Sequence, residues 1–255
     1  MIEKTTILMR LSSTRKCIFL AISQGYLYYS WLKTNTGERL MKIIVTFLVN
    51  VIFTTTVWAQ VEGVGYSWEL KRDKSDIKVF VSHVDGSKFK AVRAEMTVDA
   101  SLNSLIGLVS DSAACPQWAD LCKEERVIEQ LSATESYVYT YNDIPFPVTD
   151  RDVLAHVVWR YDPEKQKVSM TSTAITGRLE KTRAVRIEKA IAHWHFTQLE
   201  SGRVLVENFA HINPNGPTPA WVTNMLLVDS PYKTLKSMRK LIASGKYNDY
   251  QADFL

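Results

Sequence analysis

The chain has 255 residues, 46% of them hydrophobic and 11% aromatic, and a formal net charge of +4. This length and composition fit a globular protein with one large domain or two small ones, and they exclude a chain that is mostly disordered. Because lysine and arginine do not gather into runs, the composition also argues against a nucleic-acid-binding protein.

A segment typical of a secretory signal peptide begins at Met41. Lys42 supplies a positive charge, a mostly apolar stretch without charges follows, and the letters VWA place small residues just before Gln60. We therefore expect cleavage to remove residues 41–59 and the mature protein to be exported to the periplasm of a bacterium. The alternative is a membrane anchor formed by uncleaved residues 43–59, because this stretch approaches the length that spans a bilayer.

Residues 1–40 precede this segment and show no steady helical or strand period. We interpret them as lying upstream of the true start of the protein; the alternative is a translated N-terminal extension. Seven of the 31 basic and two of the 27 acidic residues lie before Gln60, which leaves 24 and 25 and a formal net charge of −1. No linker or repeat divides residues 60–255, so we predict a single domain there.

Two cysteines, Cys115 and Cys122, remain in the predicted mature chain, within the sequence CPQWADLC. An even pair in an exported protein favours a disulfide, and because the loop is short we expect a stabilisation near the lower end of the ~2–4 kcal/mol typical of such bonds. The alternative is a pair of buried free thiols. No further cysteine or nearby histidine completes a metal site with them.

The mature chain begins with short strands, which two helices follow. Apolar residues alternate in IKVFVS and again over residues 88–98, and a DG pair between them predicts a hairpin turn. Asp99 or Ser101 then caps a helix that has apolar residues at helical spacing. A second short helix follows, with Pro116 in its first turn and Trp118 packed inward.

Beyond these helices the apolar period is two over most of the chain. We expect strands over residues 165–176, 184–199 and 204–212, with an SG hairpin turn between the last two. The letters NPNGP then end the sheet, and Thr218 caps a long helix that runs to about residue 244. The apolar face of this helix includes Trp221, Met225, Val228, Leu235 and Ile242. This order predicts an α+β fold in which the helix lies across the concave face of a curved antiparallel sheet.

An Arg-Asp pair, Arg151 and Asp152, opens a strongly apolar run in IPFPVTDRDVLAHVVW. If a strand starts near Arg151, alternate residues from Arg151 to Trp159 share one face, which is otherwise apolar, and Asp152 lies on the other face. A guanidinium beside buried surface needs a partner, either an internal carboxylate or a polar group of a ligand. In the first case Arg151 forms a salt bridge that pins the preceding loop.

Several motifs occur in an order that resembles a known family. They are WELKRD with Trp68, the strands IKVFVS and KFKAVRAEM, the helix with LIGLV and the following Trp118, then PFPVTDRDVL and HINPNGPTPAWVTN. From Trp68 to Lys246 the chain is similar to the START domain, the steroidogenic acute regulatory protein-related lipid-transfer domain, and to its exported bacterial members.

This resemblance implies a helix-grip fold, shared with Bet v 1-like proteins, in which a bent sheet wraps around the C-terminal helix and encloses a tunnel for one apolar ligand. It also implies that the ligand enters when the loop before the Arg-Asp strand moves together with that helix. The gate would consist of residues 142–149, with Ile144, Pro145, Phe146 and Pro147, and of residues 216–228. The expected ligand is a lipid or a sterol- or isoprenoid-like molecule, and the resemblance does not specify which.

Aromatic and polar residues of the predicted sheet face and helix provide candidate ligand contacts. The residues that we expect to line the pocket and contact the ligand are Arg151, Tyr139, Tyr141, Trp159, Asn208, Trp221, Met225 and Val228. Arg151 would anchor an anionic or hydroxylated head group, and Met225 and Val228 would form the moving part of the gate. The alternative is that the same residues fill a solid core, as aromatic stripes usually do.

Two other functions are open. An enzyme of the same superfold, similar to a cyclase or hydratase, would use Arg151, Tyr141, Glu207 or Asn208, although no spacing forces an acid–base pair together. An envelope interaction module would use the PFPVT loop as a contact surface and keep only a vestigial pocket.

Three histidines, His193, His195 and His211, could bind zinc if the strand register brought them together, but no fourth ligand is evident. In the structural alternative, Trp194 and Phe196 face inward and the histidines face solvent. We therefore predict a monomeric protein that is not an enzyme and has no metal or cofactor. Its partner would be an apolar small molecule, with transient membrane contact and no nucleic acid.

Overall fold

The computed structural model describes residues 19–23, 26–30 and 65–255, apart from the side chains of residues 19–30, 220 and 221. The chain falls into two units, Met1–Gln60 and Val61–Leu255.

The first unit contains one described pair of strands. β1 (Phe19–Ser23) pairs antiparallel with β2 (Tyr26–Ser30). The signal peptide that we predict over residues 41–59 lies outside the described residues, so its cleavage stays a prediction.

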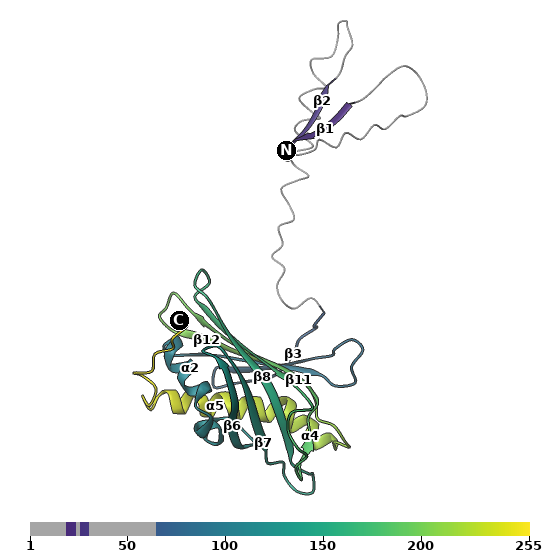
Figure 1. Cartoon of the computed structure of the whole chain (residues 1–255), viewed down its shortest axis with the longest axis vertical. Helices are drawn as coiled ribbons and strands as arrows, with labels where there is room; N and C mark the ends of the chain where they lie inside the picture. Colours follow the sequence, from purple (N-terminus) through teal and green to yellow (C-terminus); the bar gives the residue numbers. More distant parts are fainter. Residues whose placement is uncertain (1–18, 24–25, 31–64) are drawn as a thin grey trace, which may run out of the picture. The chain divides into compact units, whose positions relative to one another are not determined.

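One large sheet dominates the second unit (Figure 1). Its strands are hydrogen-bonded in the order β3-β4-β5-β12-β11-β9-β8-β7-β6, and all neighbours in this order are antiparallel. The short β10 joins the sheet as a parallel partner of β8. The strands are β3 (Glu69–Lys74), β4 (Ile77–Ser82), β5 (Ala91–Val98), β6 (Cys122–Ser132), β7 (Glu135–Asn142), β8 (Arg151–Asp162), β9 (Lys167–Ala174), β10 (Val185–Arg186), β11 (Lys189–Gln198) and β12 (Val204–Asn213).

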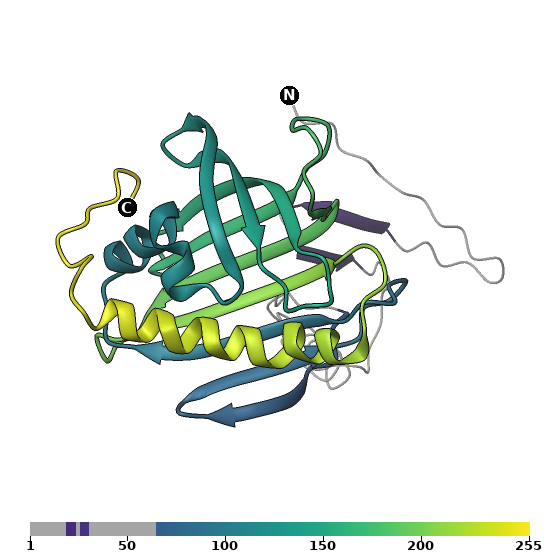
Figure 2. The same ribbon diagram turned by 90° about the horizontal axis from the view of Figure 1, so that it is seen from below.

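Helices cover one side of this sheet. Figure 2 shows α5 running across the open side of the curved sheet, with the short helices that follow β5 beside it. The helical segments are α2 (Leu102–Ser110), the 3₁₀ turn η1 (Ser112–Ala114), α3 (Cys115–Trp118), α4 (Ala220–Asn224), the π-helical turn η2 (Met225–Asp229) and α5 (Ser230–Ile242). This arrangement confirms the predicted α+β, helix-grip fold. Within the described ranges, no helix is both long and apolar enough to span a bilayer.

Local sequence explains the helices that follow β5. Ser101 is the N-cap of α2, because its hydroxyl oxygen accepts a hydrogen bond from the backbone N–H of Ser104 at 3.0 Å. Pro116 lies in the first turn of α3, where its missing N–H costs no hydrogen bond. Trp118 ends this helix and is buried, which confirms its predicted inward orientation.

The predicted long C-terminal helix is interrupted. It starts at Ala220, and the hydroxyl of Thr218 has no hydrogen-bond partner within the described part of the chain, so the predicted N-cap at Thr218 is wrong. In η2 the N–H of Ser230 donates to the carbonyl oxygen of Met225, five residues earlier, which is the π-helical pattern. The physical reason is Pro231 in the first turn of α5, whose ring crowds the preceding turn and which has no N–H to donate.

The single strand that we predict over residues 184–199 is divided into two. β10 pairs with the start of β8, and after Ile187 and Glu188 the chain continues as β11, which pairs with β9 and β12. The first part leaves the antiparallel ladder because Arg186 is bound by a buried acid of β8, as described below.

A solid apolar core fills the space between β4, β5, α2 and α5. Leu105 of α2 and Leu235 and Met238 of α5 are fully buried there, together with Ile77 and Met96 of the sheet. Burial of each such side chain contributes roughly 1.5–3 kcal/mol. This core fixes α5 against one part of the sheet, and the remaining strands enclose an open space.

Candidate functional site

An internal cavity lies between the sheet, the α2–α3 segment and the C-terminal helices. Its volume is about 1200 Å³, which slightly exceeds the roughly 300–1,000 Å³ of most ligand pockets. On β8 it is lined by alternate residues from Arg151 to Trp159, which is the face that the sequence predicts. On β9, β11 and β12 the lining includes Ala174, Ala190, Ala192 and Ala210. Because these side chains are small, the sheet here encloses a cavity and not a solid core.

Strand β7 presents the opposite face to the one that we predict. Even-numbered residues such as Thr140 line the cavity. Tyr139 and Tyr141 lie on the outer face, where their hydroxyls donate to Asp152 at 3.2 Å and to Asp150 at 2.6 Å. The predicted position of both tyrosines on the cavity wall is therefore wrong. The period of two shows that they share a face, but the pairing of β7 with β8 decides which face is inside.

The helical wall of the cavity is also rotated relative to the prediction. Leu226, Leu227 and Thr234 line it, and Met225 and Val228 do not. The wider π-helical turn shifts the register of the residues that precede α5, so the predicted cavity positions of Met225 and Val228 are wrong. The side chain of Trp221 lies outside the described part of the chain, and its ligand contact stays a prediction.

Two other candidates, Trp159 and Asn208, lie on the cavity wall. The amide nitrogen of Asn208 donates to the backbone carbonyl of His193 at 3.3 Å. Their contact with a ligand stays a prediction. Glu207, the neighbouring candidate for an enzyme, alternates with Asn208 and lies on the outer face.

The histidine-bearing strand β11 has the orientation of the structural alternative. Trp194 lines the cavity and Phe196 is fully buried. His193 and His195 lie on the other face with their rings 6.1 Å apart, and both are partly buried. His211 instead contacts the loop before β5, where its Nε2 lies 3.1 Å from the Ser87 hydroxyl.

Arg151 is 5% exposed and contacts two loops at the cavity rim. Its Nε donates to the carbonyl oxygen of Pro214 at 3.1 Å, one Nη donates to that of Asn215 at 3.0 Å, and the other Nη donates to that of Thr149. The partners are backbone carbonyls, so the salt-bridge alternative is wrong, although the pinning of the preceding loop is present. Arg151 thereby ties the loop before β8 to the loop after β12.

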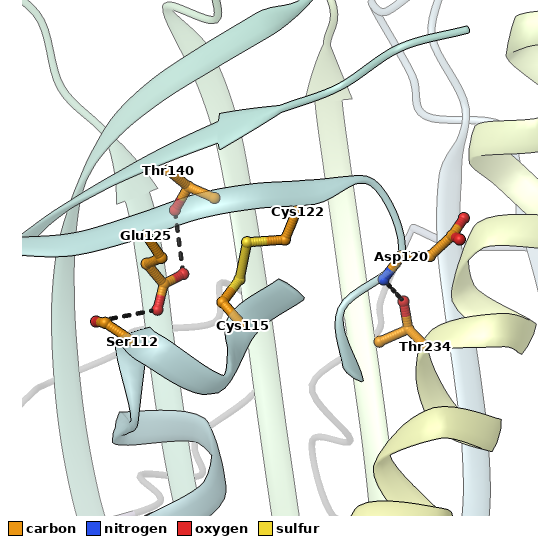
Figure 3. The surroundings of a disulfide bond; sticks show 7 residues. All are labelled: Ser112, Cys115, Asp120, Cys122, Glu125, Thr140 and Thr234. Carbon is orange, nitrogen blue, oxygen red and sulfur yellow. Dashed lines mark hydrogen bonds between the residues drawn. A yellow bond between two sulfur atoms is a disulfide. The ribbon is translucent and has the colours of Figure 1, made fainter. Parts of the chain in front are cut away.

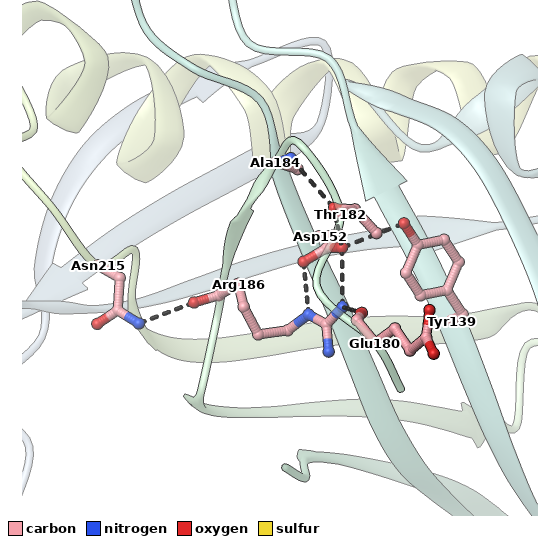
Figure 4. A network of polar contacts seen from close by, with 7 residues as sticks. All are labelled: Tyr139, Asp152, Glu180, Thr182, Ala184, Arg186 and Asn215. Carbon is pink, nitrogen blue, oxygen red and sulfur yellow. Dashed lines mark hydrogen bonds and ion pairs between the residues drawn. The ribbon is translucent and has the colours of Figure 1, made fainter. Parts of the chain in front are cut away.

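Asp152 is fully buried on the opposite face of β8 (Figure 4). Arg186 donates to both of its oxygens, at 2.6 and 3.0 Å, and the hydroxyls of Thr182 and Tyr139 donate to Oδ2 at 2.7 and 3.2 Å. Burial alone would raise the pKa of Asp152, but these hydrogen bonds and the Arg186 charge lower it. The Asn215 amide donates to the Arg186 carbonyl at 2.8 Å, which connects this network to the loop after β12.

The predicted disulfide between Cys115 and Cys122 is confirmed (Figure 3). Both side chains are buried and border the cavity. The bond closes residues 115–122, here called the disulfide loop. The backbone N–H of Asp120 in this loop donates to the Thr234 hydroxyl of α5 at 3.0 Å, so the loop is attached to the helical wall.

Next to the disulfide, Glu125 of β6 presents its carboxyl group to the cavity. The hydroxyls of Ser112 and Thr140 donate to it at 3.3 and 3.1 Å. Burial raises the pKa of Glu125, and the two hydroxyl bonds offset only part of this effect. One of its oxygens and the two sulfurs lie within 4.8 Å of one another, but both sulfurs are used in the disulfide, so the group offers a metal ion little more than one carboxylate.

Three polar atoms on the cavity wall are buried without a hydrogen-bond partner among the described residues. They are Nε1 of Trp118, Oδ2 of Asp120 and Oγ1 of Thr218. Buried polar groups are nearly always paired with protein or ordered water. These atoms therefore fit a cavity whose contents include polar groups as well as apolar ones.

The chain after α5 closes one side of the cavity, which the sequence analysis missed. Tyr250 and Phe254 line the cavity, and the Phe254 ring lies 6.0 Å from that of Trp159. Gly107 of α2 permits this closure, because a Cβ there would lie 2.6 Å from Cγ of Tyr250. The signal that could have found this contact is the cluster of aromatic residues in the last nine residues.

The predicted gate loop lies beside Arg151. Ile144 is buried and lines the cavity, and its N–H donates to Asp150 at 2.9 Å. Pro145 and Pro147 flank Phe146, whose side chain is 94% exposed. The movement of this loop stays a prediction.

Comparison with known proteins agrees with this geometry. The family profile described as START domain matches residues 54–244. An uncharacterized protein of Pseudomonas aeruginosa is 30% identical over 172 residues, which cover 68% of this chain and 85% of that protein.

Two solved structures are similar over most of the second unit. A STAR-related lipid transfer protein from Xanthomonas axonopodis is 28% identical, with a TM-score of 0.63, and covers 69% of this chain and 98% of its own. Human StAR-related lipid transfer protein 5 has a TM-score of 0.63 at 15% identity, with 80% of this chain and 95% of its own covered. At that identity the likeness concerns the fold alone.

Proposed function

This chain belongs to the START domain family, and from that premise we propose that its cavity binds one lipid or other hydrophobic molecule without a covalent bond. The observation that carries the proposal is the cavity of about 1200 Å³, whose wall is mostly apolar and includes several alanine and valine side chains of the sheet. Removing an apolar chain from water into this space contributes roughly 25 cal/mol per Å² of buried apolar area. The few polar groups on the wall then orient the ligand.

Ligand exchange in this proposal requires the two loops at the rim to separate. Arg151 supports this role, because its guanidinium bonds to carbonyl oxygens of both loops. Arg151→Ala removes these bonds, so we expect the release of a bound fluorescent long-chain alcohol to become about tenfold faster. Arg160→Ala, at the exposed end of the same strand, is the control. Unchanged release with lowered thermal stability would assign Arg151 a purely structural role.

Contact with a membrane during exchange is part of the same proposal. Phe146 is exposed at the tip of the gate loop, and Lys88 and Lys90 border the cavity. An exposed apolar tip and cations at the cavity border are features that suit transient binding to an anionic bilayer surface. Action as a monomer in the periplasm, after removal of residues 41–59, completes the proposal.

The test is native mass spectrometry with lipid extraction on the protein purified from the envelope of its own host. A stoichiometric, chemically unchanged lipid would support the carrier function and identify the ligand class. Conversion of the extracted molecule on incubation would instead support an enzyme. A protein that is free of ligand and takes up none from a membrane extract would contradict the proposal and favour an interaction module.

A further inference from the structure

Glu125 is a partly buried acid that the proposed carrier function does not use. A β-bulge between Cys122 and Glu124 places Glu125 on the cavity side of β6. Bulges of this kind redirect side chains next to functional sites. Glu124, its neighbour, lies on the exposed side, where Arg126 lies 3.4 Å from it.

The polar groups around Glu125 can accept hydrogen bonds from a ligand but have none to donate. Ser112 and Thr140 each donate their hydroxyl hydrogen to a different oxygen of Glu125 (Figure 3). A hydroxyl has one hydrogen, so both side chains retain only acceptor capacity toward the cavity. The three residues together offer acceptors and no donor to a ligand.

The charge of Glu125 is also uncompensated. Over residues 65–255, excluding the side chains of 220 and 221, neither lysine nor arginine forms an ion pair with it. Arg151 lies on β8, two strands away, which is about 10 Å at the usual strand spacing. A buried carboxylate is stable when a cation is paired with it.

We propose that Glu125, Ser112 and Thr140 form a binding site for the protonated amine of a long-chain amphiphile. An ammonium group has three N–H donors, no acceptor and one positive charge, which matches three acceptors and one negative charge. A hydroxyl head group would use fewer of the acceptors, and a carboxylate or phosphate would be repelled. This inference rests on the proposed function, because it assigns the head group of the ligand that the cavity holds.

The raised pKa of Glu125 agrees with a site that lacks its cation in the empty cavity. Other ionisable groups near the site have partners of their own. Asp111 accepts from Lys246 at 2.9 Å and from the Tyr247 hydroxyl at 2.8 Å. Asp120 has Lys233 within 3.8 Å.

The experiment is a titration of the delipidated full chain with three probes that share a sixteen-carbon chain: hexadecylamine, hexadecanol and hexadecanoate. We expect the amine to bind wild type most tightly. Glu125→Gln keeps the size of the side chain and removes its charge, so it should weaken amine binding roughly 10- to 100-fold and alcohol binding by less than about threefold. Glu124→Gln, the matched control on the exposed side of β6, should change neither affinity.

A second measurement uses wild type alone. Amine affinity should fall as the pH is lowered from 7.5 to 5, because Glu125 becomes protonated while the amine stays charged, and alcohol affinity should not follow this trend. Asp111, whose pKa is lowered by its hydrogen bonds to Lys246 and Tyr247, should remain ionised over most of this range.

The outcomes separate the two proposals. Equal loss of amine and alcohol binding in Glu125→Gln, or no loss of amine binding, would overturn the amine site while the cavity still binds a chain. Failure of all three probes to bind wild type would overturn the proposed function itself.

Discussion

Two acids, the fully buried Asp152 and the partly buried Glu125, lie on opposite faces of the same sheet and have opposite surroundings. Asp152 is 0% exposed, and Arg186 binds both of its oxygens. Glu125 faces the cavity and receives hydrogen bonds from two hydroxyls, and no lysine or arginine of residues 65–255 forms an ion pair with it. The pKa of the first is lowered and that of the second is raised.

The two sets of surroundings distinguish polar groups that stabilise the fold from polar groups that remain available to a ligand. All partners of Asp152 belong to the protein, and they attach the segment around β10 to β8. Glu125 has hydrogen-bond partners but no cationic partner among the described residues, so its charge is available to a ligand. The identity of the partners distinguishes these two roles.

The largest expected effect comes from Asp152→Asn. It leaves the guanidinium of Arg186, whose side chain is 18% exposed, without its counter-charge. We expect the free energy of unfolding, measured with urea, to fall by about 3–5 kcal/mol.

Asp162→Asn, at the exposed end of the same strand, is the control and should cost less than about 1 kcal/mol. The double variant Asp152→Asn with Arg186→Gln removes both charges and should lose less than the sum of the two single variants. Additive losses would mean that the two side chains do not act as a pair.

The next effect concerns the loop beside Glu125. Replacing both Cys115 and Cys122 with serine opens a loop with a sequence separation of 7. We expect a loss of about 2–3 kcal/mol of unfolding free energy, because the unfolded chain is no longer constrained.

Combining the double cysteine replacement with Asp152→Asn tests whether the two faces of the sheet contribute independently to stability. The two sites lie on opposite faces and share no partner, so their losses should add within about 0.5 kcal/mol. Strong coupling between them would show that the cavity wall and the outer network form one unit.

The smallest expected effect is that the two acids change the free energy of unfolding in opposite directions as the pH rises. Asp152 has a lowered pKa, so its stabilisation is present above the unfolded value of about 3.9 and is lost as the pH falls through its folded value. Glu125 has a raised pKa, so the folded chain binds more protons than the unfolded chain above about pH 4.3, and its ionisation destabilises the fold as the pH rises.

Urea unfolding at several values between pH 3 and 8 measures this difference. The advantage of wild type over Asp152→Asn should shrink toward low pH. Glu125→Gln should become more stable relative to wild type toward high pH. Parallel curves for wild type and Glu125→Gln would refute an uncompensated carboxylate at this site.

Much of the fold follows from local patterns. The alternation on β8, the cap at Ser101, the short helix at Pro116 and the disulfide were all predictable, because each depends on residues that are close in sequence. Pro231 was also visible, and reading it as a helix break would have corrected the register of the helical wall.

The candidate site was less predictable. A period of two shows which residues of a strand share a face, but it does not show which face is inside, so Tyr139 and Tyr141 were placed on the wrong side. Glu125 escaped notice because register shifts in the pairing of β6 with β7 break the period in that strand.

The sequence by itself determined the family, the order of the elements and the apolar face that starts with Arg151, because these depend on periodicity and on motifs with a fixed order. Only the tertiary structure decided that Arg151 bonds to loop carbonyls, that the chain after α5 closes the cavity with Phe254, and that Glu125 lacks a cation. These are contacts between segments far apart in the chain, and their partners are set by the packing of the sheet against the helices.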